Sequence, residues 1–304
     1  MPTESFHVVT GAFGYTGQYI TRLLLSQGTR VTTLTGHPDR PNPLAQRVEV
    51  APFNFDRPDE LARSLEGAAS VINTYWVRFN YERAYDRAVE NTRTLIDAAV
   101  RAGAQRFVHV SISNPSKDSS LPYFRGKAIL ETAIIDSGLS YAIVRPTVIF
   151  GLEDILLNNI AWVLRKFPVF AVPGSGDYRL QPIFVEDMAA LVVDAARDSS
   201  NSVIDAAGPE VFTFNQLVAM LAMTVKSWAR IIHVSPQLAL TLSGVIGRLT
   251  HDVLLTKDEV RGLLTNLLVS KDPPRGWTRL SEWLGENADK IGRSYASELA
   301  RHYR

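Results

Sequence analysis

Short apolar segments alternate with helical segments over the first two thirds of the chain. The apolar segments are rich in β-branched residues, whereas the segments between them repeat apolar residues every three or four positions. Expected strands cover residues 8–10, 30–35, 46–53, 69–74, 105–111, 139–150 and 203–207. Expected helices cover residues 20–25, 60–65, 82–102, 154–167 and 213–225, and another begins at Tyr123. Strands that alternate with helices predict an α/β fold with a doubly wound parallel sheet.

The last third of the chain has a helical pattern. Apolar residues recur at helical spacing in 263–268 and 280–284, and a mixture of Arg and Glu in 293–304 predicts a solvated terminal helix. Trp277 and Trp283 are expected to anchor the packing of this region.

Composition excludes several classes of function. The chain has 304 residues, of which 46% are hydrophobic and 21% charged, as in a globular protein with a sizeable core. Its net charge of +1 argues against a general nucleic-acid surface, which would need a concentration of basic residues. The absence of cysteine excludes disulfides and thiolate chemistry and fits a reducing cytoplasm, the expected location. The six histidines lack metal-ligand spacing, so no metal site is expected. No signal-peptide pattern is present, and the longest apolar stretch, 238–246, is too short for a membrane span.

A glycine-rich turn follows the first expected strand. Three glycines spaced three apart stand between that strand and a helix, where a dinucleotide pyrophosphate needs a tight reversal, close backbone approach and close helix packing. The helix N-terminus adds unpaired N–H groups and a partial positive charge. An ordinary loop is the alternative. The residues expected to bind the cofactor here are Thr10, Gly11, Phe13, Gly14, Tyr15, Thr16 and Gly17.

The end of the second expected strand bears on the choice between NAD and NADP. An acid at this position favours NAD, whereas a cation accommodates the 2′-phosphate of NADP. The stretch that follows residue 35 lacks a carboxylate at the strand end and contains His37 and Arg40. These two side chains favour NADP slightly, although a solvated loop explains them equally well.

Tyr123 and Lys127 are the candidate catalytic pair. They lie four residues apart at the start of an expected helix, so both side chains share one face. A nearby ammonium lowers the pKa of a phenol, which can then exchange a proton with a substrate hydroxyl while hydride moves to or from a nicotinamide. A serine hydroxyl such as that of Ser113 or Ser111 can hold the carbonyl oxygen.

The order TGxxGxxG, Asn91, serine and YxxxK resembles the extended and atypical short-chain dehydrogenase/reductase (SDR) families. The resemblance covers about the first two thirds of the chain. It implies an NAD(P)-dependent oxidoreductase, epimerase or dehydratase that acts on a carbonyl or hydroxyl of a small molecule. It also implies that Tyr123 is the acid/base, that Lys127 is its partner and a ribose ligand, and that Ser113, or otherwise Ser111, holds the carbonyl.

The same resemblance implies further cofactor contacts and a domain division. Asp56 corresponds to the aspartate that meets the adenine, Asn73 and Thr74 end the strand that lines the cofactor groove, and Pro146 lies in an RPxxxxG segment beside the nicotinamide. Tyr75 and Trp76 depart from the small residues usual after that strand, and they narrow the groove or simply pack. The expected units are a Rossmann domain of residues 1–150, to which 181–207 return, and a smaller, mostly helical substrate part of 151–180 and 208–304. SDR proteins of this kind are often homodimers.

One departure supports a second interpretation. The loop between Ser113 and Tyr123 is shorter than in catalytic extended SDRs, and YFRGKAILE is most similar to atypical members related to the complex I accessory subunit and to NmrA-like proteins. Several of those bind the dinucleotide with little or no turnover. A regulatory or redox-sensing NAD(P)-binding protein is therefore the alternative function, whereas an α/β hydrolase is excluded because no GxSxG elbow occurs.

Overall fold

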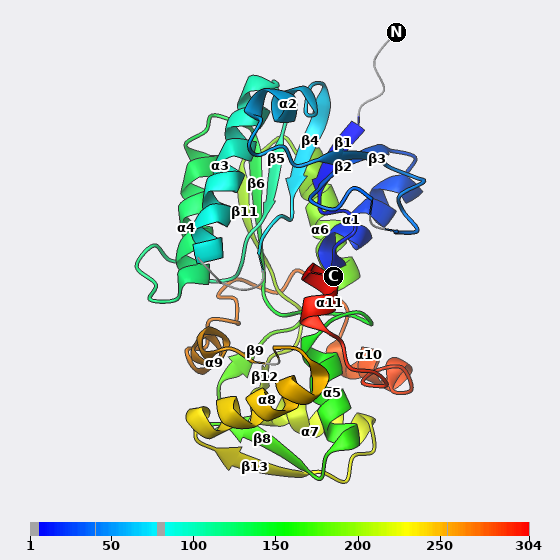
Figure 1. Cartoon of the computed structure of the whole chain (residues 1–304), viewed down its shortest axis with the longest axis vertical. Coiled ribbons are helices and arrows are strands. Elements are labelled where there is room, and N and C mark those ends of the chain that lie inside the picture. Colours follow the sequence, from blue (N-terminus) through cyan, green and yellow to red (C-terminus); the bar gives the residue numbers. More distant parts are fainter. Residues whose placement is uncertain (1–5, 40, 78–82, 254, 304) are drawn as a thin grey trace. The chain divides into compact units, whose positions relative to one another are not determined.

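The structure is a computed structural model that describes residues 6–39, 41–77, 83–253 and 255–303 (Figure 1). The chain forms two compact units. The first comprises Met1–Pro146 and Met188–Ile204, and the second comprises Thr147–Asp187 and Asp205–Arg304. No described helix is long and apolar enough to cross a bilayer.

The first unit is built on a seven-stranded sheet with the strand order β11-β6-β5-β4-β1-β2-β3. Its strands are β1 (Phe6–Thr10), β2 (Arg30–Thr35), β3 (Glu49–Pro52), β4 (Ala68–Asn73), β5 (Phe107–Val110), β6 (Tyr141–Pro146) and β11 (Ser202–Ala206). Neighbouring strands from β1 to β6 pair in parallel. The carboxyl ends of these strands therefore meet at one edge of the sheet, where ligands bind in folds of this kind. The α/β fold class expected from the sequence is confirmed.

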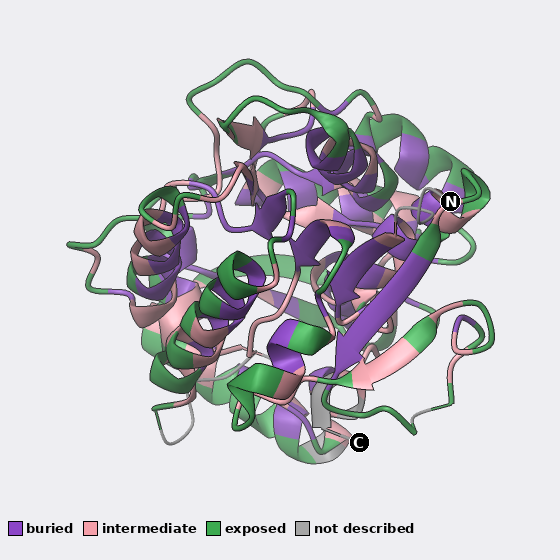
Figure 2. Cartoon of the chain, turned by 90° about the horizontal axis from the view of Figure 1, so that it is seen from above, coloured by how far each residue is buried: buried purple, intermediate pink, exposed green. Residues whose placement is uncertain are grey.

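Helices cover both faces of this sheet. The helices α2 (Pro58–Arg63), α3 (Ala84–Arg101) and α4 (Pro122–Ile135) lie on one side, and α1 (Tyr15–Ser26) and α6 (Val185–Arg197) lie on the other (Figure 1). Fully buried Val71, Leu95, Phe107 and Ile143 belong to the core between the sheet and the first of these layers. The central strands are accordingly mostly buried, the edge strands β3 and β11 are partly exposed, and the helices expose their outer faces (Figure 2).

The second unit contains the remaining helices and three two-stranded sheets. Its helices are α5 (Leu156–Lys166), α7 (Phe214–Thr224), α8 (Pro236–Thr250), α9 (Lys257–Leu264), α10 (Leu280–Asn287) and α11 (Glu298–Tyr303). The strand pairs are β10 (Ile183–Phe184) with β7 (Ile149–Phe150), β12 (Phe212–Thr213) with β9 (Arg179–Leu180), and β13 (Arg230–Val234) with β8 (Val169–Pro173). Thr213 caps α7, as expected, through a reciprocal capping box with Gln216.

Three details of the last third differ from the sequence prediction. The chain forms strand β13 although no strand was expected after residue 225, and α9 ends at Leu264, so 263–268 is not a continuous helix. Trp283 is buried as expected, whereas Trp277 is 62% exposed and does not anchor a core. An apolar ring by itself therefore did not indicate which of the two tryptophans packs.

Candidate functional site

The turn after β1 requires each of its three glycines. Gly11 has φ of +69°, a left-handed conformation that side chains disfavour, and its N–H donates to the Leu34 carbonyl at 2.8 Å. The N–H of Gly14 donates to the Gly11 carbonyl at 2.8 Å and closes the turn. A Cβ on Gly17 would lie 2.1 Å from that same carbonyl oxygen. The turn is therefore tight, with helix α1 packed directly against it.

The start of α1 suits an anion. Gly14 is its N-cap and, within the described part of the chain, no side chain caps it and no acid lies in its first turn. The first N–H groups of a helix need acceptors from outside the helix, and the helix dipole makes this end positive. Phe13, Tyr15 and Thr16 lie in this same short segment. The segment from Thr10 to Gly17 thus fits a pyrophosphate, as the sequence suggests.

A buried polar network fixes the ends of β1, β4 and β5. The Thr10 hydroxyl donates to Oδ1 of Asn73 at 2.9 Å and accepts the N–H groups of Thr74 and Tyr75 at 2.8 and 3.0 Å. Nδ2 of Asn73 lies 3.0 Å from Nδ1 of His109. Burial lowers the pKa of His109 well below its usual value, so this imidazole is neutral. The network holds the backbone after β4 beside the glycine turn.

Tyr75 belongs to an aromatic group on the β3 side of this edge. Its ring centroid lies 5.0 Å from that of Phe53 and 5.1 Å from that of Phe55, and Asn91 donates to its hydroxyl at 2.9 Å. Burial raises the pKa of the Tyr75 phenol, which therefore stays protonated. Asn91, the expected helix asparagine, thus positions Tyr75.

The residues expected at the adenosine end are open to solvent. His37 follows β2 and is exposed, and its backbone N–H donates to the Thr35 hydroxyl at 3.1 Å. Asp56 follows β3 and is also exposed. Arg40 lies outside the described residues. Of the expected contacts for the adenosine half, His37 and Asp56 therefore lie beyond the ends of adjacent strands, free to move toward a ligand.

Lys127 is buried at the centre of the site. Its side chain comes from α4, and Nζ donates to the Val110 carbonyl at 2.9 Å, directly at the end of β5. Burial lowers the pKa of this lysine to about 7, against the opposing effect of the Glu131 carboxylate. A cation held by one carbonyl in an apolar environment retains capacity for further hydrogen bonds, because an ammonium has three donors.

An aromatic cluster of Trp76, Tyr85 and Tyr123 meets the Lys127 ammonium through Trp76. Nζ of Lys127 lies 4.6 Å from the centroid of the Trp76 ring, within cation–π range. The Trp76 ring centroid is 5.5 Å from those of both Tyr85 and Tyr123, and the two tyrosine rings are 5.9 Å apart. A Cβ on Gly126 would lie 3.0 Å from the Trp76 ring, so α4 approaches the indole closely. Trp76 is thus in contact with both members of the candidate pair.

The two candidate serines differ in their surroundings. The Ser111 hydroxyl donates to Oε1 of Glu131 at 2.5 Å, and Glu131 also pairs with Arg145 through two hydrogen bonds of 3.0 and 2.5 Å. Ser113 is buried, and its N–H donates to the Pro146 carbonyl at 2.9 Å. Ser111 is therefore part of a charged network under α4, whereas Pro146 fixes the backbone of Ser113 at the end of β6.

Glu131 and Arg145 were missed as site residues, although a signal was available. Tyr123, Lys127 and Glu131 are spaced four apart on one helix, which places an acid next to the lysine on the same face. Tyr85 gave no comparable signal, because only the fold brings the start of α3 to the start of α4. Within the described part of the chain, no group of three or more His, Asp or Glu residues is arranged to hold a metal ion.

Known proteins support an NAD(P)H-binding site of this kind. A family described as NAD(P)H-binding matches residues 11–154, which include the glycine turn, the aromatic cluster and α4. The chain is similar to "NADH dehydrogenase [ubiquinone] 1 alpha subcomplex subunit 9, mitochondrial" of Arabidopsis thaliana. The two are 28% identical over 284 residues, which cover 86% of this chain and 70% of that protein.

Solved structures show the same fold at low sequence identity. An NADPH-dependent quinone oxidoreductase from Escherichia coli in complex with NADPH has a TM-score of 0.73 at 19% identity, over 92% of this chain and 99% of that one. A nucleoside-diphosphate-sugar epimerase from Staphylococcus aureus has a TM-score of 0.72 at 14% identity, with the same coverage of 92% and 99%.

Proposed function

We propose that the chain is an NAD(P)-dependent oxidoreductase of the extended short-chain dehydrogenase/reductase type, whose acid/base is Tyr123. The observation that carries the proposal is the placement of Lys127. It is buried at the carboxyl end of β5, on the same helix as Tyr123. The glycine turn at the end of β1 lies at the same edge of the parallel sheet.

The glycine turn would hold the cofactor. The backbone from Gly11 to Gly17 receives the pyrophosphate at the start of α1, with Thr10, Asn73 and Thr74 fixing the neighbouring strand end. When bound, the dinucleotide supplies or accepts the hydride. The lack of an acid at the end of β2, with His37 nearby, favours NADP over NAD.

Tyr123 and Lys127 would move the proton that accompanies the hydride. The Lys127 ammonium favours the phenolate of Tyr123 electrostatically and donates to the ribose of the cofactor. Tyr123 takes the proton from the substrate hydroxyl, or returns it to the carbonyl oxygen. Ser113, which is buried and whose N–H donates to the Pro146 carbonyl at the end of β6, would hold that oxygen where charge develops. The substrate is a small molecule with a carbonyl or hydroxyl group.

A second function is favoured by the position of Trp76. Its indole lies over the ammonium that would meet the ribose and against the Tyr123 ring, so it competes with a ligand for space beside both groups. A protein that binds NAD(P)(H) with little turnover, as a sensor or as a subunit of a larger assembly, would tolerate this arrangement. The similarity to a protein named as a subunit of NADH dehydrogenase points the same way.

The test compares two hydroxyl deletions in the aromatic cluster. Binding of NADPH and NADH is measured by calorimetry, and turnover is measured with a panel of ketones, aldehydes and quinones for wild type, Tyr123→Phe and Tyr85→Phe. For an oxidoreductase, Tyr123→Phe lowers turnover roughly 10²- to 10⁴-fold and retains cofactor binding, while Tyr85→Phe keeps most of the activity. Binding without turnover in wild type supports the second function. Absence of binding to either cofactor contradicts both.

A further inference from the structure

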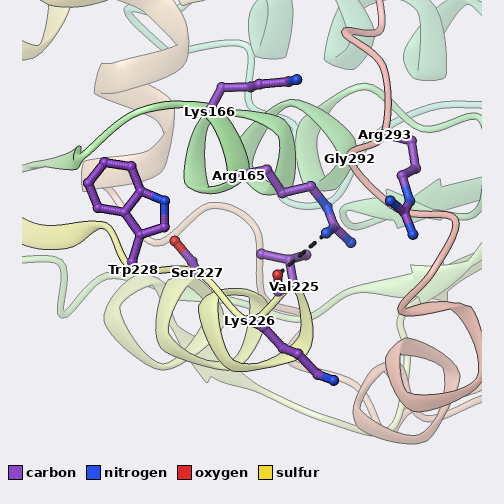
Figure 3. A pocket seen from close by; sticks show the side chains of 8 residues that line it. All are labelled: Arg165, Lys166, Val225, Lys226, Ser227, Trp228, Gly292 and Arg293. Atoms are coloured by element: carbon purple, nitrogen blue, oxygen red, sulfur yellow. Dashed lines mark hydrogen bonds between the residues drawn. The ribbon is translucent and has the colours of Figure 1, made fainter.

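The second unit contains a basic pocket of about 210 Å³ that the proposed oxidoreductase does not use (Figure 3). Three separate segments line it: the end of α5, the loop after α7 and the turn after α10. Four of its eight lining residues are cationic, namely Arg165, Lys166, Lys226 and Arg293, and none is acidic. A concave surface with charges of one sign concentrates ligands of the opposite sign.

Arg165 is held in the pocket by backbone carbonyls. Its guanidinium donates to the carbonyls of Ala288, Ile291 and Val225 at 2.8, 3.2 and 3.4 Å. These bonds use three of the five N–H donors of a guanidinium, and they fix its position without neutralising its charge. Burial lowers the pKa of Arg165, and the nearby Arg293 charge lowers it further. An anion bound here would relieve this unfavourable electrostatic interaction.

Arg293 follows a turn that is packed onto α5, and its own side chain is 62% exposed. Gly292 has φ of +66°, and a Cβ there would lie 2.6 Å from atoms of Ala161. The N–H of Gly292 also donates to Oδ1 of Asn158 at 3.0 Å. The carboxylate of Asp289 lies 3.7 Å from Arg293, but that acid is fully exposed, and such a pair neutralises little charge.

The two lysines lie farther out. Lys166 and Lys226 are exposed, and their ammonium groups point away from the pocket in different directions (Figure 3). Arg165 and Lys166 lie in the last turn of α5, where positive side chains stabilise the negative end of the helix dipole, and this role alone explains why both are cationic. It does not account for Lys226 and Arg293, which come from other segments. The lysines therefore extend the positive field around the two arginines.

We propose that this pocket binds the phosphate group of a phosphate ester. Arg165 and Arg293 contact its oxygens, because guanidinium groups match phosphate geometry, and the lysines attract it from solvent. Trp228 lies at the same pocket with 69% of its surface exposed, and its ring offers a face to the organic part of the ester. The ester is either a soluble metabolite or the headgroup of an anionic lipid, since both present the same phosphate chemistry.

The test uses the full chain and two charge-matched variants. Arg293→Gln removes a cation from the pocket, whereas Arg261→Gln removes one from an exposed position on α9 in the same unit. Titration calorimetry at low ionic strength measures binding of inorganic phosphate and of glycerol 3-phosphate. Sedimentation measures binding to phosphatidylcholine vesicles with and without phosphatidic acid. Neither substitution affects phosphate that binds at the glycine turn of the first unit. A loss of phosphate binding seen only in Arg293→Gln is therefore a loss of binding at the pocket.

Loss of one charge-assisted contact is expected to weaken binding roughly 10- to 100-fold in Arg293→Gln, with Arg261→Gln close to wild type. If Arg293→Gln weakens binding of inorganic phosphate and glycerol 3-phosphate, the ligand is a soluble metabolite. If Arg293→Gln weakens only the binding of vesicles that contain phosphatidic acid, the ligand is a lipid headgroup. Equal behaviour of the two variants in both assays, or no saturable binding by wild type, overturns the proposal. None of these outcomes depends on turnover, so the proposal can fail or hold independently of the oxidoreductase.

Discussion

The glycine turn and the aromatic cluster lie at the same edge of the sheet but are built in opposite ways. The turn depends on glycine, which has no side chain, because a Cβ on Gly17 would lie 2.1 Å from the Gly11 carbonyl oxygen. In the cluster, the rings of Trp76, Tyr85 and Tyr123 pack 5.5 to 5.9 Å apart, and Trp76 lies over the Lys127 ammonium. The turn therefore has almost no tolerance for substitution, whereas the cluster can rearrange by moving a side chain. Cofactor binding depends on the first region and access to the proton-transfer groups on the second.

The largest effect is expected from Gly17→Ala. The new methyl group has no room unless the turn or α1 moves, and either movement takes the N–H groups at the start of α1 away from a pyrophosphate. We expect binding of NADPH to weaken by at least about 100-fold, since several charge-assisted hydrogen bonds are lost together. Calorimetric titration of the folded variant with NADPH measures this loss.

Gly285→Ala is the matched control for that variant. Gly285 also lies in a helix, α10, but a Cβ there would meet nothing within 4 Å. The same change is expected to stabilise the protein by up to about 1 kcal/mol through helix propensity and to leave cofactor binding unaltered. If Gly17→Ala bound NADPH as tightly as Gly285→Ala does, the steric account of the turn would be wrong.

The next effect concerns the pH dependence of stability at Lys127. Its pKa falls from 10.5 to about 7 on folding because of burial. Between these values only the unfolded chain holds the proton, so the free energy of unfolding rises with pH by about 1.4 kcal/mol per unit. Below pH 7 both states are protonated and the cost of burying the charge is fully present.

Urea unfolding of wild type and Lys127→Met from pH 6 to pH 9 tests this sign. The stability of wild type relative to the variant is expected to be flat below pH 7 and to increase by about 2 to 3 kcal/mol by pH 9. Other titrating groups are common to both proteins and cancel in the difference. A difference that stayed constant or decreased across this range would contradict a buried lysine with a lowered pKa.

The two regions also differ in how well the sequence predicts them. The glycine turn follows from local spacing, because strand, glycines and helix are contiguous and their steric requirements are local. The α/β fold and the shared face of Tyr123 and Lys127 follow from periodicity in the same way. The contacts of Trp76 and Tyr85 could not be deduced, since they join β4, α3 and α4 across the fold. Likewise, the pairing of Ser111 with Glu131 depends on the packing of α4 against β5, which spacing alone does not specify.

A smaller effect is expected from Trp76→Ala. A nicotinamide ribose that takes the place of the indole at Lys127 breaks a cation–π contact worth about 0.5 to 2 kcal/mol. Removal of the ring should therefore tighten binding of NADPH by about 2- to 30-fold. Affinity for adenosine 2′,5′-bisphosphate, which lacks both the nicotinamide and its ribose, should not change. Competition binding of the two ligands measures the difference.

Trp277→Ala serves as the control for loss of a tryptophan, because Trp277 is 62% exposed and belongs to the other unit. It should leave both affinities at wild-type values. Equal tightening of NADPH and adenosine 2′,5′-bisphosphate in Trp76→Ala would show that the indole does not act at the nicotinamide ribose, and weaker binding of NADPH would make Trp76 a cofactor contact.

The smallest effect is a shift in the titration of Lys127 in Glu131→Gln. The carboxylate favours the protonated lysine, so its removal lowers the lysine pKa further. The substitution also breaks the ion pair with Arg145 and changes stability by a constant amount at each pH. Comparison of Glu131→Gln with the double variant Glu131→Gln/Lys127→Met cancels that constant. The rise of stability with pH should then begin below pH 7, and an unchanged onset would show that Glu131 acts on Ser111 and Arg145 alone.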